Sequence, residues 1–200
     1  MKNIVYFDLE TQKSAAEVGG WGNKHKMLMS IGVTYSTLSG QYQIFQEHEV
    51  DQLITQMTRA DLVVGFNHVG FDYSVLNAYT PFDFKQLPSF DILVAVEKIL
   101  GIKIKLDSIA SATLGYSKTA EGMQALIWWK EGKIYEIAEY CAYDVKITKE
   151  VFEFGAIHGV LYYSDKTGRR CHFKVDWRKE AGGIPAPAPA TIPDRIPSLS

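Results

Sequence analysis

Asp8 and Glu10 stand two positions apart in the segment NIVYFDLE near the start of the chain. Residues 3–9 are rich in β-branched and aromatic side chains, which predicts a strand. Alternate residues of a strand project from one face, so the two carboxylates would lie side by side. Such a pair repels unless a cation neutralises it, and Mg²⁺ and Mn²⁺ prefer carboxylate oxygens. Taken alone, the pair fits better with a strand end where both acids reach solvent.

A third acid, Asp72, follows the apolar segment 62–66 in the sequence GFNHVGFD. That apolar segment predicts a short strand buried on both faces. Loops at the ends of buried strands commonly carry functional groups. Asp72 could equally be the N-cap of the helix predicted over 73–78, and Asn67 could satisfy backbone groups of the turn.

Tyr140 and Asp144 lie within the longest helical pattern, residues 133–158. Residues four apart share one face of a helix, so the hydroxyl and the carboxylate can point to the same place. An amphipathic helix with a half-buried tyrosine and a solvated aspartate would give the same spacing. Each of the three motifs is therefore weak by itself.

The elements needed to position these residues follow one another along the chain. Hydrophobic periodicity and turn residues predict strands over 3–9, 27–36, 41–47, 62–66 and 89–92, and helices over 49–59, 73–78, 92–100, 106–114, 120–129 and 133–158. Three consecutive strands followed by alternating units indicate an α/β domain, a mixed sheet with helices on its faces.

The end of the chain predicts a hairpin and then a tail. Strands over 160–164 and 170–175 flank Asp165-Lys166-Thr167-Gly168, which is a good turn sequence. Residues 181–200 are rich in proline and alanine and are expected to stay flexible. We therefore expect one domain over 1–180 and a tail over 181–200.

Composition limits the function classes. A net charge of −2 argues against a tight, sequence-independent duplex binder, although bound cations could still gather phosphate. Cys141 and Cys171 have neither zinc-ligand spacing nor a disulfide framework. Neither a membrane span nor a signal-peptide pattern is present in the sequence, so a soluble, cytoplasmic protein is expected.

Together the motifs are far more specific than apart. DxE in the first strand, NxxxFD after the fourth and YxxxD on a late helix resemble the DEDD superfamily of 3′–5′ exonucleases, in its tyrosine branch. The histidine branch would need histidine at position 139, which is Glu139 here. The resemblance spans residues 3–155 and implies a ribonuclease H-like fold with a mixed five-stranded sheet. Within the superfamily, the chain is most similar to predicted exonucleases related to the proofreading domain of family B DNA polymerases.

The resemblance also implies roles for single residues. The catalytic set would be Asp8, Glu10, Asp72, Tyr140 and Asp144, with the four carboxylates holding two divalent ions, Mg²⁺ or Mn²⁺. Asp8 would bridge both ions, Glu10 and Asp144 would hold the ion that activates water, and Asp72 would help to position the second. Tyr140 would orient the attacking water or help to take its proton. Thr11 and Asn67 would contact the substrate. Trp21, in a glycine-rich loop, could stack on a base as a third substrate contact, although a tryptophan in such a loop more often anchors the loop.

The implied activity is removal of nucleotides from the 3′ end of single-stranded nucleic acid. Sequence leaves open whether the substrate is DNA or RNA, and it leaves protein partners unknown. Two alternatives remain: an endonuclease of ribonuclease H type, and a non-catalytic nucleic-acid-binding module. The Tyr140–Asp144 pair favours the exonuclease over the endonuclease, and the presence of all four acids disfavours the binding module.

Overall fold

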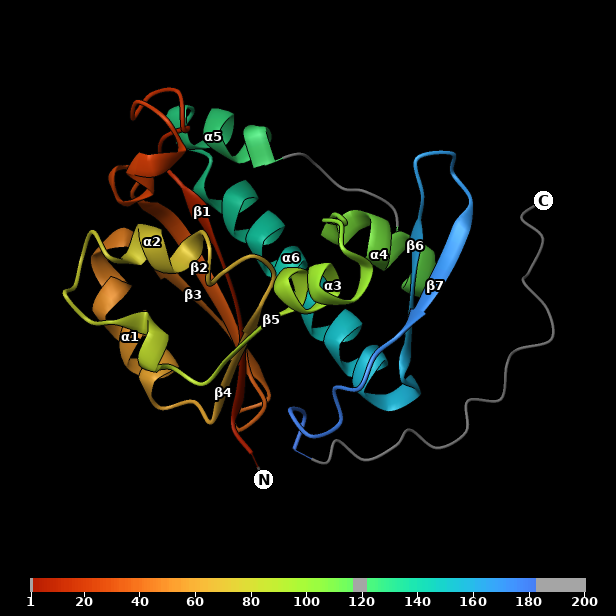
Figure 1. Ribbon diagram of the computed structural model, residues 1–200. Helices are drawn as coiled ribbons and strands as arrows, with labels where there is room; N and C mark the ends of the chain where they lie inside the picture. The colour runs from red at the N-terminus through yellow and green to blue at the C-terminus, as the bar shows by residue number, and fades with distance from the viewer. Residues whose placement is uncertain (1, 117–121, 183–200) are drawn as a thin grey trace, which may run out of the picture.

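The computed structural model describes residues 2–116 and 122–182, which form a five-stranded sheet with helices on both faces and a separate two-stranded hairpin (Figure 1). In the sheet the strands lie in the order β3-β2-β1-β4-β5. Their bounds are β1 (Ile4–Thr11), β2 (Met29–Ser36), β3 (Gln41–Gln46), β4 (Leu62–Gly65) and β5 (Ser89–Asp91). The helices are α1 (Val50–Thr58), α2 (Asp72–Leu76), α3 (Ile92–Leu100), α4 (Leu106–Leu114), α5 (Gly122–Lys130) and α6 (Ile134–His158).

The sheet is mixed, which confirms the predicted fold class. Strands β1, β2 and β3 form an antiparallel meander, and β4 and β5 join β1 in parallel after helical connections. Pairing between β1 and β4 covers only Ile4 to Tyr6, so the second half of β1 has no β4 neighbour. The carboxyl ends of these three strands therefore open onto a common edge, where loops can bring side chains together.

Alternation along β1 divides the interior into two cores. Val5, Phe7 and Leu9 face α1 and α2, whereas Ile4 and Tyr6 face α6. Figure 1 shows α1 and α2 on one side of the sheet and α6, α3 and α4 on the other. Asp8 and Glu10 have the same parity as Ile4 and Tyr6, so they project toward α6.

Helix α6 is the main cover of that face. Its buried stripe includes Ile137, Cys141, Val145 and Phe152, at the spacing expected for one face of a helix. The helix ends at Gly159, whose φ of 67° lies in the left-handed region that glycine adopts without strain. Its length lets one helix cross from the edge of the sheet where the acids lie to the hairpin.

The predicted hairpin is present as β6 (Val160–Ser164) and β7 (Arg170–Lys174), paired antiparallel. It stands against α4 rather than joining the main sheet (Figure 1). Beyond it, Trp177 is buried against Phe152, with the two rings stacked at 5.9 Å between centroids. Ala181, the first residue of the expected tail, is also buried, and residues 183–200 lie outside the described residues.

Several element boundaries differ from the sequence prediction. Strand β1 continues to Thr11 instead of ending at residue 9, because β2 supplies partners as far as Met29. Strand β2 begins at Met29 instead of residue 27, because Leu28 adopts a φ of 59° that a strand cannot contain. Helix α5 was predicted from residue 120, which lies outside the described residues. Among the described residues, no helix is long and apolar enough to span a membrane.

Candidate active site

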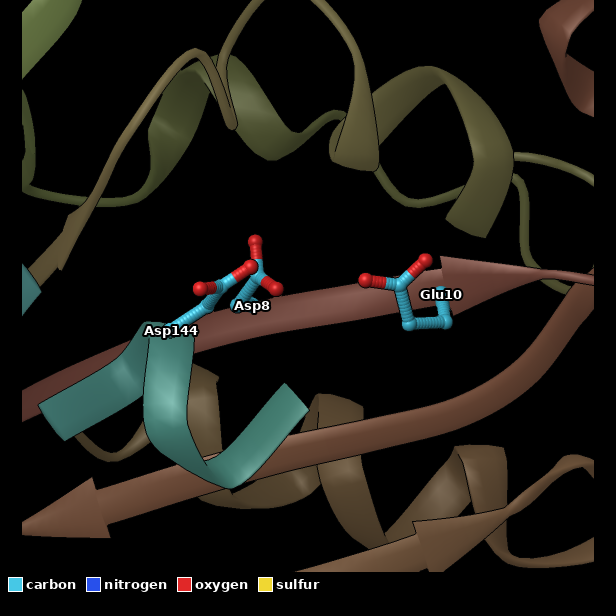
Figure 2. A group of neighbouring side chains, drawn as sticks. All are labelled: Asp8, Glu10 and Asp144. Atoms are coloured by element: carbon cyan, nitrogen blue, oxygen red, sulfur yellow. The ribbon is translucent and has the colours of Figure 1, made fainter. Parts of the chain in front are cut away.

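Three carboxylates meet between β1 and α6. Asp8 and Glu10 project from β1 and Asp144 comes from α6, each half-buried (Figure 2). One ligand oxygen from each residue lies within 4.8 Å of the others. The structure thus brings together three of the four acids that the sequence predicts to share a site.

Local packing explains the meeting. Asp8 and Glu10 pair with Val33 and Ile31 of β2, so the pairing with β2 fixes their positions along β1. Cys141, one turn before Asp144, is fully buried and its thiol lies 3.6 Å from Oδ2 of Asp8 and 3.4 Å from the backbone oxygen of the same residue. Because Cys141 and Asp144 share a helix face, this contact places Asp144 over Asp8.

The cluster is electrostatically unfavourable without a cation. Burial, followed by the charges of Asp72, Asp144 and Glu10, raises the pKa of Asp8 well above its ordinary value. Burial and the charges of Asp144 and Asp72 do the same for Glu10. Burial, with a smaller contribution from Asp107, raises the pKa of Asp144 to about 7. Crowded carboxylates of this kind fit a hard divalent cation, which prefers oxygen ligands and would offset their repulsion.

Asp72 lies beside the cluster as its fourth acid. It is buried at the first position of α2, and its Oδ1 accepts a hydrogen bond of 3.2 Å from the backbone N–H of Leu9. Leu9 lies on the part of β1 beyond the β4 pairing, so the carboxylate takes the place of a strand neighbour. Burial raises the pKa of Asp72 to about 7. The charge of Asp72 therefore helps to raise the pKa of Asp8 and of Glu10, while its Oδ1 accepts the bond from the backbone.

Tyr140 joins the cluster from the turn of α6 that precedes Asp144. Its hydroxyl is hydrogen-bonded to the Asp144 carboxylate, as the YxxxD spacing predicts. Burial, the three nearby carboxylates and this hydrogen bond raise the pKa of Tyr140 far above its ordinary value. Trp128 of α5 contacts the ring edge-on, with centroids 6.2 Å apart. The phenol is therefore held protonated beside the acids.

The loop that carries Asp72 is tied to the rest of the site by Asp91. This buried carboxylate accepts hydrogen bonds from Asn67 N–H at 2.8 Å and Val69 N–H at 3.1 Å, and it also caps α3. Asn67 itself is exposed and has a φ of 63°, a conformation that asparagine tolerates better than most residues. Asn67 thus shapes the turn, and the described contacts do not bring its side chain to the acids.

An apolar cavity of about 630 Å³ opens beside Glu10. Its lining includes Thr11, Trp21, Phe71 and Met123. Trp21 is exposed and contacts Phe71 edge-on at 6.2 Å, so it does not anchor its loop by being buried. The Thr11 hydroxyl donates to the Lys13 carbonyl, just after an irregularity in the β1–β2 register. Two of the predicted substrate-contacting residues, Thr11 and Trp21, therefore share one cavity.

Three residues around the acids were not predicted from sequence: Cys141, Asp107 and Asp91. The buried stripe of α6 includes Cys141, but nothing local shows which strand it faces. Asp91 precedes a predicted helix, which is an N-cap signal, yet its bonds to the Asn67 loop cross from another strand. Asp107 lies in the first turn of α4, and only the fold brings its charge near Asp144.

Comparison with known proteins agrees with this architecture. No curated protein matches the chain. Among solved structures, a family B DNA polymerase from the hyperthermophilic archaeon Pyrobaculum calidifontis is similar with a TM-score of 0.57 and 15% identity, over 78% of this chain. The chain covers only 24% of that polymerase, so the likeness concerns the fold of one part of it. The family model of the RNase H superfamily matches residues 5–154, a span that holds most of β1 and of α6 and every carboxylate of the cluster. The chain therefore belongs to the RNase H superfamily.

Proposed function

We propose that the protein is a metal-dependent 3′–5′ exonuclease of the DEDD superfamily, in its tyrosine branch, that hydrolyses single-stranded nucleic acid. The observation that carries this proposal is the Tyr140–Asp144 pair of α6 set against Asp8 and Glu10, with an apolar cavity opening at Glu10. Membership of a superfamily of nucleases supports phosphodiester hydrolysis. The cavity beside the acids supports action on a chain end, because it can accept one terminal nucleotide.

The four carboxylates would hold two divalent ions, Mg²⁺ or Mn²⁺. Bound ions of this kind supply Lewis acidity and lower the pKa of water, so that hydroxide forms near neutral pH. Asp8 would contact both ions, and Glu10 and Asp144 would hold one of them. For Asp72, only the Oδ2 atom has no bond to the backbone of Leu9, so that oxygen would face the ions.

Tyr140 would act by donating a hydrogen bond. In the metal-free site, burial and the surrounding carboxylates hold the pKa of the phenol far above its ordinary value, so it keeps its proton there. A protonated phenol cannot serve as a general base, but it can orient the attacking water beside Asp144. Trp128 limits the rotation of the ring and so keeps the hydroxyl aimed at the acids.

The cavity at Glu10 would receive the 3′-terminal nucleotide. Trp21 and Phe71 offer aromatic faces to a base, and stacking of one base on one aromatic ring contributes roughly 1–3 kcal/mol. Thr11 lines this cavity next to Glu10, where it would contact the terminal sugar. A single strand would be preferred, because pairing must be broken before the last nucleotide can enter.

The test is digestion of 5′-labelled DNA and RNA oligonucleotides, single- and double-stranded, with Mg²⁺, Mn²⁺, Ca²⁺ or excess chelator. We expect a ladder of shortening products from single strands with Mg²⁺ or Mn²⁺, little activity with Ca²⁺ and none with chelator. Asp8→Asn should abolish cleavage, whereas Asp51→Asn, an exposed acid on α1, should leave it unchanged.

Substrates with altered ends separate this proposal from its rivals. A 3′-phosphate should slow digestion and a circular strand should resist it. Internal cuts in the circle would instead indicate an endonuclease of ribonuclease H type. Binding of oligonucleotides without cleavage under any of the metal conditions would indicate a non-catalytic nucleic-acid-binding module.

A further inference from the structure

A second cavity, of about 740 Å³, lies between the α3–α4 connection and the tip of the β6–β7 hairpin. It shares no lining residue with the apolar cavity at Glu10. Three exposed lysines line it, Lys103, Lys105 and Lys166, together with Asp107. The two cavities therefore differ in their charged lining: three lysines and two aspartates line this basic cavity, whereas one lysine and one glutamate line the cavity at Glu10.

Positive charge is concentrated around this cavity, although the chain as a whole has a net charge of −2. The hairpin carries Lys166, Arg169 and Arg170 near its tip, against one acid, Asp165. That acid is engaged within its own turn: it accepts hydrogen bonds from Thr167 and Arg169, which lower its pKa to about 2. The charge of Asp165 is offset by Arg169 at 3.2 Å, and Lys103 lies 4.0 Å from Glu97, so Lys105 and Lys166 supply the positive charge that the cavity presents to a ligand.

The basic cavity begins next to the carboxylate cluster. Asp107 lines it from the first turn of α4, and α4 packs against α6, the helix that carries Asp144. The adjacent Ser108 also lines the cavity and is hydrogen-bonded to Ser164 of β6. One turn of α4 thus connects the acids to the hairpin.

The wall formed by the hairpin is held firmly in place. Ser108 and Ser164 exchange two hydrogen bonds of 3.2 Å, and Thr113 and Tyr162 exchange two of 3.0 Å. Arg170 donates to the Ala112 carbonyl at 2.8 Å and lies over the Tyr162 ring at 4.0 Å. The basic cavity is therefore a preformed groove between α4 and the hairpin, and a ligand would not have to order its walls.

We propose that this groove binds the sugar-phosphate backbone of the substrate strand upstream of its 3′-terminal nucleotide. The inference rests on the proposed function, because it assigns the route of a strand whose end lies at the carboxylates. Lys105 would neutralise the phosphates that are nearer the acids and Lys166 those at the hairpin tip. The groove contacts are phosphate contacts, so they would raise affinity for longer strands without selecting a sequence.

The test compares Lys105→Gln/Lys166→Gln with the control Lys85→Gln, an exposed lysine outside both cavities, on the 3-10 helix η3 (Phe84–Gln86). Binding of 5′-fluorescent oligonucleotides of three and twelve nucleotides is measured by anisotropy with Ca²⁺ present, across a range of salt. We expect about five- to twentyfold weaker binding of the twelve-mer and no change for the three-mer. The slope of log Kd against log salt should fall by about 1.4, since each lost phosphate contact on a single strand removes about 0.7.

The possible outcomes distinguish this inference from the proposed function. If the wild type degrades oligonucleotides but the double variant binds the twelve-mer with unchanged affinity and salt slope, the groove assignment is wrong and the proposed function stands. Equal loss for both lengths would also overturn it, because the lysines would then act at the terminal nucleotide or on the fold. If the wild type neither binds nor degrades any oligonucleotide, both proposals fail.

Discussion

Asp72 and Asp144 each have a pKa near 7, and this makes the stability of the metal-free protein depend on pH. An unfolded aspartate titrates near 4, so between about pH 4 and pH 7 the folded state binds more protons than the unfolded state. Their contribution to stability is therefore complete below pH 4 and is lost as pH rises through 7. The loss for the pair should be at most about 8 kcal/mol, since each unit of pKa difference corresponds to about 1.4 kcal/mol.

Thermal unfolding in chelator from pH 5 to pH 8 measures this effect. Asp144→Asn removes one of the two titrations, so its melting temperature should rise relative to the wild type as pH increases. Saturating Mn²⁺ should reverse the order, because metal binding competes with protons and strengthens with pH. A constant difference between the two proteins across this range would contradict the pKa assignment.

Tyr140→Phe isolates the hydroxyl that is hydrogen-bonded to Asp144. If the phenol orients the attacking water, kcat should fall by about 10²-fold, the lower end for a positioned proton-transfer group, while KM changes little. Because the wild-type phenol stays protonated, the pH dependence of kcat should be the same in both proteins. A basic limb that disappears in the variant would show instead that Tyr140 takes a proton.

At this scale, the sequence was sufficient to predict site residues that lie a few positions apart in one element. DxE on a strand and YxxxD on a helix each fix which side chains share a face, and the structure brings those residues together. The sequence could not predict contacts between residues that are far apart along the chain. The thiol of Cys141 beneath Asp8, and the bond from Leu9 to Asp72, depend on which elements meet.

At the scale of elements, the loop between β4 and α2 depends on one side chain from the end of β5. Asp91 accepts four backbone N–H bonds, from Asn67, Val69, Leu93 and Val94. Asp91→Ala would leave these donors without their partner and should cost about 2–4 kcal/mol, measured by urea unfolding. Asp91→Asn keeps one oxygen that can accept three of the bonds, so it should recover much of that loss.

Asn67 offers a separate test of the same loop. Glycine adopts a φ of 63° without strain, so Asn67→Gly should leave the free energy of unfolding within about 1 kcal/mol of the wild type. If the side chain contacts the substrate, this variant should raise KM although its fold is intact. An unchanged KM would assign Asn67 to the turn alone.

Most elements could be predicted because their hydrophobic periods are unambiguous. Helices α3 and α4 and strand β6 begin and end where the pattern places them. The errors occur where a neighbour overrides the local signal: β1 extends to Thr11 because β2 pairs with it, and Leu28 breaks the strand with a left-handed turn.

At the scale of the whole molecule, the segment after the hairpin is part of the core. Trp177 is 3% exposed, stacks on Phe152 and lies against Gly155, where an added Cβ would come within 2.8 Å of the ring. Trp177→Ala should cost about 3–5 kcal/mol. Removal of residues 183–200, whose composition is rich in proline and alanine, should leave the melting temperature unchanged. Calorimetry of the two variants checks both expectations, and a large shift on truncation would assign the tail a packing role.

The family match ends at residue 154, before the hairpin begins. Sequence predicted the two strands from their turn, but it could not show that they would pack on α4 and create a basic groove. That outcome depends on pairs such as Thr113 with Tyr162, which are far apart in the chain. Local patterns carry no information about such contacts.

The order in which the acids occur along the chain has a consequence during synthesis. Asp8 leaves the ribosome first, Asp144 follows only after all five strands of the sheet have been translated, and Trp177, which stacks on Phe152 of α6, comes later still. Domains generally fold as units, so a nascent chain that stops short of α6 holds Asp8 and Glu10 without their third partner. Such a chain has no complete ion-binding cluster. A chain with the activity proposed above would therefore gain it only after α6 has been translated and packed on the sheet.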